Sequence, residues 1–262
     1  MSTPPLTEPT QVPSRRRIAA EVSIVLGLSL GASAIYSLVA IASRLTQPVA
    51  LSQQTATLNR SLSDRELFDL IYQVLSVFFD LMPVALVCYL LWRTARPHLG
   101  RLGLSFDRPL RDVGWGVGLA LAVGIPGLAF YFLGRAIGIS VSVVPTALDA
   151  YWWTVPVLLL SAMRAAVTEE VIAIGYLYLR LAEAGWRRWT IILGSALLRG
   201  SYHLYQGFGA FIANFVMGVA FGWLYTRYGR LLPLVVTHFA LDAAVFIGYP
   251  WAAATFPALF GL

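Results

Sequence analysis

The sequence predicts an all-α, polytopic membrane protein built as a bundle of about seven transmembrane helices. The first observation is its composition, with 58% hydrophobic and 12% charged residues among 262, whereas a soluble domain carries roughly 25% charged residues. The second is a series of apolar runs, each close to the ~20 residues that a helix needs to cross hydrocarbon. At this length, a single membrane domain is the simplest organisation.

The elements follow in order. Residues 1–17 are polar, with Pro and Thr before three arginines, so we expect a disordered cytoplasmic N-terminus ahead of a transmembrane domain at 18–262. The first apolar run, 18–42, exceeds the ~7–15 residues of a signal-peptide core, so a retained span is favoured over a cleaved one. Further spans are predicted at 68–91, 113–134, 154–180, 189–205, 208–226 and 231–248.

The basic residues predict the orientation. All 19 are arginines, which hints at a GC-rich bacterial genome, and they flank the apolar runs instead of forming a patch, which argues against a nucleic-acid partner. With the N-terminus in the cytoplasm, thirteen arginines lie at cytoplasmic span ends and four outside. We therefore expect a multi-pass plasma-membrane protein surrounded by lipid. Cys88 is the lone cysteine, so no disulfide framework exists.

Ionisable side chains concentrate in the last four predicted spans. An ionisable group at the centre of a span costs about 2.5–3.5 kcal/mol on insertion scales, so it needs a partner, a cavity or a function. Arg199 and His203, and likewise His238 and Asp242, are four residues apart and share a helix face. The polar residues of these spans are Arg164, Glu169, Glu170, Arg199, His203, Asn214, His238 and Asp242. Their clustering predicts one common site.

This set of side chains favours hydrolysis by a glutamate-activated water. Two adjacent carboxylates in a low-dielectric site resist double ionisation, so one can take a proton from water and return it to a leaving amine. The histidines can hold the water, stabilise an oxyanion or bind a metal. No HExxH or G-x-S-x-G motif is present. Two alternatives therefore stay open, a zinc ion held by Glu169, His203 and His238 and a site without a metal.

Purely structural interpretations compete with the catalytic one. Glu169 with Arg164, and Glu170 with Arg199, are candidates for buried ion pairs that only fix packing. His203 is also a candidate for a packed histidine at a helix end, beside interfacial tyrosines. Gly218 and Gly222 form a small-xxx-small pair, which indicates close helix packing.

The ordered motifs resemble the CAAX protease and bacteriocin-processing (CPBP, or Abi) family of intramembrane proteases, over a core of about 154–245. The matching positions are Glu169-Glu170, then His203, then His238-x-x-x-Asp242. Supporting similarity lies at 221–225, 229–231 and 233, and at 102–104 with 108–115. The resemblance implies that Glu169 activates water, with Glu170 supporting it. It also implies that His203 and His238 complete the site and that Asp242 orients His238 or polarises the substrate carbonyl.

Three positions depart from the family pattern. Ile174 stands where the family has arginine, Arg199 where it has phenylalanine, and Asp242 where it has asparagine. We interpret the first two as relocation of one charge to a neighbouring helix and predict that Arg199 pairs with one of the two motif glutamates. The extra charge of Asp242 would offset Arg164 or a protonated histidine.

The leading hypothesis is therefore an intramembrane CAAX-type endopeptidase acting on a membrane-associated peptide or lipidated protein. A second hypothesis is a non-catalytic scaffold or bacteriocin-immunity protein that retains the cavity, since Ile174 leaves room for an inactive relative. A third is a proton-coupled transporter in which the glutamate and histidines form a relay. The sequence lacks the repeats and paired broken helices typical of many transporters.

Overall fold

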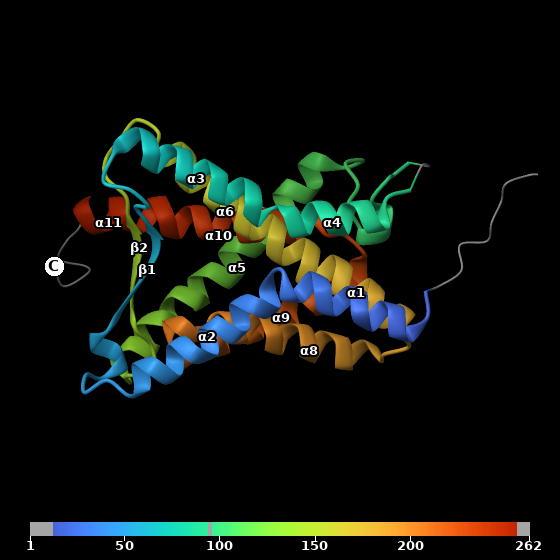
Figure 1. Cartoon of the computed structure of the whole chain (residues 1–262), viewed down its shortest axis with the longest axis horizontal. Helices are drawn as coiled ribbons and strands as arrows, with labels where there is room; N and C mark the ends of the chain where they lie inside the picture. Colours follow the sequence, from blue (N-terminus) through green and yellow to red (C-terminus); the bar gives the residue numbers. More distant parts are fainter. Residues whose placement is uncertain (1–12, 94–95, 256–262) are drawn as a thin grey trace, which may run out of the picture.

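The computed structural model describes residues 13–93 and 96–255, and helices dominate it, which confirms the all-α prediction (Figure 1). The α-helices are α1 Arg15–Gly27, α2 Leu30–Leu45, α3 Glu66–Asp80, α4 Met82–Leu91, α5 Pro109–Ala136, α6 Thr154–Glu169, α7 Leu177–Glu183, α8 Arg188–Tyr202, α9 Phe208–Tyr228, α10 Leu232–Ala243 and α11 Tyr249–Thr255. Two π-helices, η3 Glu170–Tyr176 and η5 Ala244–Gly248, continue α6 and α10. Short 3₁₀ turns are η1 Leu51–Gln53, η2 Gly100–Leu102 and η4 Leu204–Gln206.

The first predicted span is a bent pair of helices. α1 and α2 meet at an angle of 55°, and the Ser29 hydroxyl donates a hydrogen bond to the Val25 carbonyl at 2.6 Å beside the break. α1 already begins at Arg15, because the Ser14 hydroxyl accepts from the Arg17 N–H at 3.4 Å. The end of the segment expected to be disordered, residues 15–17, is therefore helical, and residues 1–12 lie outside the described part of the chain.

Four helical segments among the described residues are long and apolar enough to cross a membrane, or five if the bent pair counts as one. They are Glu66–Leu91, Pro109–Ala136, Phe208–Tyr228 and Leu232–Ala252. The predicted count of seven is not confirmed. The span expected at 154–180 is a continuous helical run of α6, η3 and α7, but it carries Arg164, Glu169, Glu170 and Arg180 and so is not among these apolar segments. The span expected at 189–205 contains α8, which has 15 residues, short of the ~20 that a span needs. These two predicted spans hold most of the predicted site residues.

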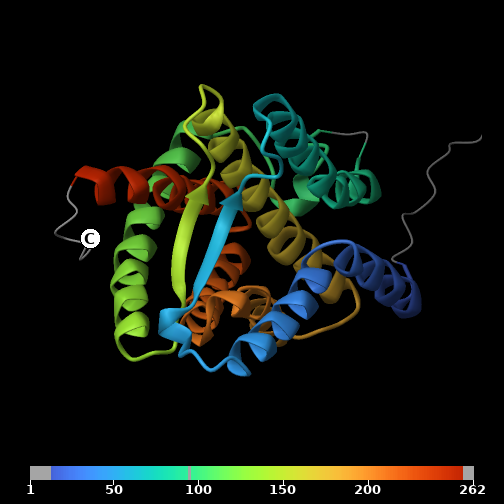
Figure 2. The same ribbon diagram turned by 60° about the vertical axis from the view of Figure 1, so that its left-hand side comes forward.

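A small parallel sheet, which the sequence interpretation did not anticipate, lies at one end of the bundle. β1 Thr55–Arg60 and β2 Ser142–Ala147 pair in register, with Thr55 opposite Ser142. Both segments are loops between predicted spans and contain β-branched residues suited to strands. The two strands lie side by side across the helix ends (Figure 2). The start of α1, the end of α4 and the start of α8 gather at the opposite end (Figure 1).

Helices from both halves of the chain surround the centre of the bundle. α10 packs against α5 and α6, while α8 packs against α2 and α9. The main core cluster includes Ile172 and Tyr176 of η3, Ile192 of α8, Phe221 of α9 and Val235 of α10. The π-helix η3 is entirely buried among these neighbours. The ionisable residues adjoining it are thereby held away from the lipid-facing surface.

An ion-pair network fixes the arginine-rich end of the bundle. The Arg180 guanidinium of α7 pairs with Glu21 of α1 at 2.6 Å and with Glu183 at 2.8 Å. Arg101 of η2 also pairs with Glu183, and the Tyr176 hydroxyl donates to Glu21 at 3.1 Å. Glu21, which the sequence placed near the end of the first span, therefore joins α1 to the helix that follows the paired glutamates.

The predicted close packing at Gly218 and Gly222 is confirmed. A Cβ atom added at Gly218 would lie 2.9 Å from the Ala196 Cα of α8, and one at Gly222 would lie 1.9 Å from the Tyr178 hydroxyl. Real Cβ atoms do not approach other atoms this closely, so the absence of a side chain lets α9 approach the α8 backbone at Gly218 and the Tyr178 hydroxyl of α7 at Gly222. A Cβ atom added at Gly194, by contrast, would have no neighbouring atom within 4 Å.

We expect Gly218→Ala to destabilise the protein by about 1–3 kcal/mol, because the added methyl group forces α8 and α9 apart. The matched control is Gly194→Ala, which we expect to be neutral or stabilising by up to about 1 kcal/mol through helix propensity. Thermal unfolding of the purified protein in detergent measures both. Equal shifts in the same direction for the two variants would show that the α8–α9 contact is not tight at Gly218.

Candidate active site

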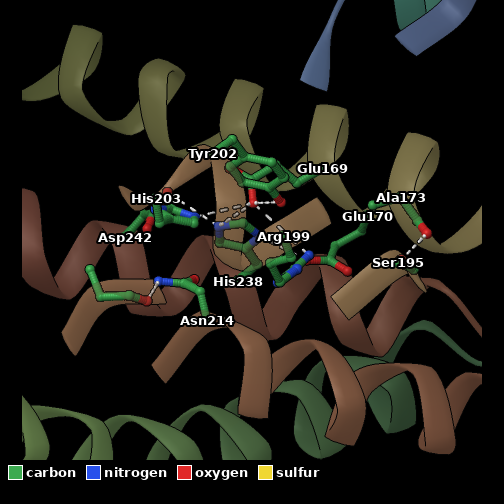
Figure 3. Close-up of polar contacts among 11 residues, drawn as sticks. Glu169, Glu170, Ala173, Ser195, Arg199, Tyr202, His203, Asn214, His238 and Asp242 are labelled. Carbon is green, nitrogen blue, oxygen red and sulfur yellow. Dashed lines mark hydrogen bonds and ion pairs between the residues drawn. The ribbon is translucent and has the colours of Figure 1, made fainter. Parts of the chain in front are cut away.

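The two adjacent glutamates lie where α6 gives way to the π-helix η3. Glu169 is the last residue of α6 and Glu170 the first of η3. Neighbouring residues in a helix point about 100° apart, and here the two carboxylates reach different partners (Figure 3). π-helical turns are rare and frequently occur at functional sites. The change from α-helix to π-helix therefore occurs at the two glutamates that the sequence predicts to be catalytic.

Glu170 forms a fully buried ionic contact with residues from two other helices. Its Oε1 atom pairs with the Nη2 atom of Arg199 on α8 and lies 2.8 Å from Nδ1 of His238 on α10. Glu170 is 0% exposed, Arg199 1% and His238 4%. The prediction that Arg199 pairs with a motif glutamate is confirmed. Because a carboxylate only accepts, the Nδ1–H group of His238 is the donor, which leaves its Nε2 atom facing the site.

Glu169 lies at the centre of the remaining polar groups. Its Oε2 atom accepts a hydrogen bond from the Tyr202 hydroxyl at 2.7 Å. The same oxygen lies 3.8 Å from Nε2 of His203, 3.9 Å from Nε2 of His238 and 4.0 Å from Nη2 of Arg199. These three separations are too long for direct hydrogen bonds, so Tyr202 is the direct partner of Oε2 and the other three groups surround it. Three helices thus converge on one carboxylate oxygen (Figure 3).

The third motif extends the cluster along α10. His238 and Asp242 are one turn apart, and His238 Nε2 lies 3.6 Å from Asp242 Oδ2. Asp242 is the most exposed of the acidic groups in the cluster, with 24% of its side chain accessible, against 13% for Glu169. Within the described residues, neither ring nitrogen of His203 has a hydrogen-bond partner. The imidazoles therefore have nitrogens available for a bound molecule.

Two residues that the sequence grouped with the site have hydrogen-bond partners outside the Glu/His cluster. The Arg164 guanidinium donates to Asp80 of α3 at 2.9 Å, so the alternative pairing of Arg164 with Glu169 is wrong. The sequence suggested Glu169 because Arg164 precedes it by five residues, whereas the packing of α3 against α6 supplies a partner 84 residues away. Asn214 of α9 donates to the Ala210 carbonyl at 3.0 Å. It lines a cavity of about 150 Å³ together with Tyr131 and Gln206.

The arrangement of the three residues proposed for zinc does not suit a metal ion. Among the described residues, no group of three or more His, Cys, Asp or Glu side chains is placed to hold one. The carboxylate oxygen that a metal would use already accepts the Tyr202 hydroxyl, and the Arg199 cation lies 4.0 Å from it. A divalent cation beside a buried guanidinium is electrostatically unfavourable. Glu169, His203 and His238 therefore do not fit a metal site.

Tyr202 is the site residue that sequence reasoning missed. The sequence interpretation treated it as an interfacial tyrosine next to His203, yet it is buried and bonded to Glu169. The available signal was its spacing of three residues from Arg199, which places both side chains on one face of α8. Propensity alone does not separate a membrane-interface tyrosine from a buried one, because the hydroxyl is satisfied in either setting.

Comparison with protein families gives a match for this region. The model described as type II CAAX prenyl endopeptidase Rce1-like matches residues 151–244, which include both glutamates, both site histidines and Asp242. The matched range agrees with the core of about 154–245 expected from the motifs. No curated protein and no solved structure matched the chain.

Removing one partner of the Glu170–Arg199 ion pair should lower the stability of the folded protein. We expect Arg199→Leu to destabilise the protein by about 3–5 kcal/mol, because Glu170 would be left as a buried charge without a cation. The double variant Arg199→Phe with Ile174→Arg places an arginine four residues after Glu170, at the position where the family has one. We expect this variant to recover part of the stability that Arg199→Phe alone loses. Thermal unfolding measures all three variants. An unchanged midpoint for Arg199→Leu would refute the structural role of the pair.

Proposed function

We propose that this protein is an intramembrane endopeptidase that uses a Glu169-activated water, since residues 151–244 match the family model of type II CAAX prenyl endopeptidase Rce1-like proteins. The observation that carries the proposal is the position of Glu169 Oε2, 3.8 Å and 3.9 Å from the Nε2 atoms of His203 and His238. A water molecule beside Glu169 Oε2, at hydrogen-bond distance from it, lies within reach of a base and of the imidazoles. The Glu169 side chain is also partly accessible to solvent, whereas the Glu170 side chain is fully buried.

In the proposed reaction, Glu169 takes one proton from the water as the water oxygen attacks the carbonyl carbon of the scissile bond. The carbonyl π electrons move to oxygen, and the resulting oxyanion lies beside the histidines, which can stabilise it by hydrogen bonding. When the oxyanion collapses, the C–N bond breaks and the proton held by Glu169 passes to the leaving amine. The second water proton stays with the new carboxyl group, so atoms and charges balance.

The other site residues would support this chemistry without exchanging the catalytic proton. Glu170 accepts from His238 Nδ1 at 2.8 Å and so fixes which ring nitrogen faces the water. Arg199 neutralises Glu170, which keeps a second unpaired charge out of the buried site. Asp242, 3.6 Å from His238 Nε2, is placed to favour a charged imidazole during the reaction.

We further propose that the substrate is a membrane-associated CAAX-type peptide or lipidated protein, as the description of the matching family suggests. The proposed topology keeps the N-terminus and the arginine-rich end of the bundle in the cytoplasm of a plasma-membrane protein. The exposed apolar side chains of α3, α5 and α9 fit a lipid environment. The scaffold and transporter hypotheses remain as outcomes that the following experiment distinguishes.

We expect Glu169→Gln to reduce cleavage of a farnesylated CAAX-type reporter peptide by at least about 1,000-fold, because the amide cannot take a proton from water. The assay uses purified protein in proteoliposomes. Glu66→Gln is the matched control, since Glu66 is exposed in the first turn of α3, and it should cleave like the wild type. Equal cleavage by Glu169→Gln and wild type would exclude this mechanism. Proton-coupled flux without cleavage would favour the transporter.

Chelation should leave the activity unchanged, because the site residues do not fit a metal and no step of the proposal uses one. The measurement is the cleavage rate after incubation with 1,10-phenanthroline and after dialysis against EDTA, with metal content determined in parallel. Loss of activity on chelation that zinc restores would show that Glu169, His203 and His238 rearrange around an ion.

A further inference from the structure

The Tyr202 hydroxyl is the direct hydrogen-bond partner of the proposed base. It lies 2.7 Å from Glu169 Oε2, while the two histidine nitrogens and the Arg199 guanidinium lie 3.8–4.0 Å away. Tyr202 is 5% exposed, so this contact is shielded from water. Its ring also packs beside the His203 imidazole, with a centroid distance of 4.8 Å and an angle of 45° between the planes.

The two glutamates are held by different groups from one helix. Arg199 binds Glu170, and Tyr202, three residues later on the same face of α8, binds Glu169. Arg199 donates directly to Glu170 and lies 4.0 Å from Glu169 Oε2, beyond hydrogen-bond distance. A phenol instead supplies a neutral donor, which satisfies one oxygen of Glu169 and keeps its negative charge available for proton transfer. Glu170, the proposed supporting carboxylate, thus has the charged partner, and Glu169, the proposed base, has the neutral one.

We propose that Tyr202 is a positioning residue for the reaction, which holds the Glu169 carboxylate in its ionised form and aims it at the water between the two imidazoles. This inference rests on the proposed function and extends it to a residue outside the three motifs. The hydrogen bond fixes the rotation of the carboxylate, because Oε2 is both its acceptor and the atom nearest His203 and His238. The ring contact fixes His203 at the same time.

The first test is Tyr202→Phe, which keeps the ring and removes only the hydroxyl. Loss of a hydrogen bond to a charged group should lower kcat by roughly 10- to 100-fold, with KM for the farnesylated CAAX-type peptide changed by less than about twofold. The matched control is Tyr205→Phe, because the Tyr205 hydroxyl accepts from Gln206 at 2.8 Å and has no hydrogen bond to either glutamate. This control should keep the wild-type kcat.

A purely structural role would lower the yield of folded protein without separating kcat from KM. Wild-type kcat in Tyr202→Phe, or an equal loss in Tyr205→Phe, would overturn the inference. Absence of cleavage by the wild-type protein would instead overturn the proposed function. The two failures are therefore distinguishable in one set of assays.

The second test does not depend on activity. A double-mutant cycle compares the effect of Tyr202→Phe on Tm in the wild-type and Glu169→Gln backgrounds. We expect a decrease of about 5 °C in the wild type and roughly half of that with the neutral amide, because a hydrogen bond to a charged acceptor is about twice as strong. Equal decreases in the two backgrounds would show that the hydroxyl does not act on the Glu169 charge.

Discussion

The buried ion pair between Glu170 and Arg199 is the interaction on which the site depends. Both side chains are removed from water almost completely, so each charge is tolerable only while the other is present. The pair joins η3 to α8, and the contact between Glu170 and His238 extends the link to α10. Three helices that are distant in sequence are thereby held in one relative position, which is the condition for a precise catalytic arrangement.

The origin of the arginine has consequences for the packing of the bundle. Ile174, at the position where the resembling family carries arginine, is fully buried in the core beside the site. The cation is Arg199 of α8, and its Cδ atom lies 3.3 Å from the position that a Cβ atom of Gly218 would occupy. A glycine on α9 thus makes room both for the close approach of α8 and for the guanidinium. Helix packing and charge compensation are satisfied by the same residue.

α8 together with its C-terminal cap His203 contributes three residues to the polar cluster, against two from α10 and two from the junction of α6 and η3. It carries Arg199 and Tyr202, and His203 follows at its C-terminal end. Because one donor is charged and the other neutral, the adjacent glutamates occupy different electrostatic environments despite being neighbours in sequence. This asymmetry supports the different roles that we propose for the two carboxylates.

The sequence by itself determined the membrane character, the helical class and the set of ionisable residues. The length of an apolar run shows whether a helix can cross the bilayer, and an ionisable residue within such a run is costly enough to stand out. It also placed His238 and Asp242 on one face, since a helix fixes that geometry locally. Only the tertiary structure decided that Arg199 binds Glu170 and that Arg164 binds Asp80. A charge pairs with the nearest opposite charge in space, and helix crossings determine which one that is. The parallel pairing of 55–60 with 142–147 is equally non-local.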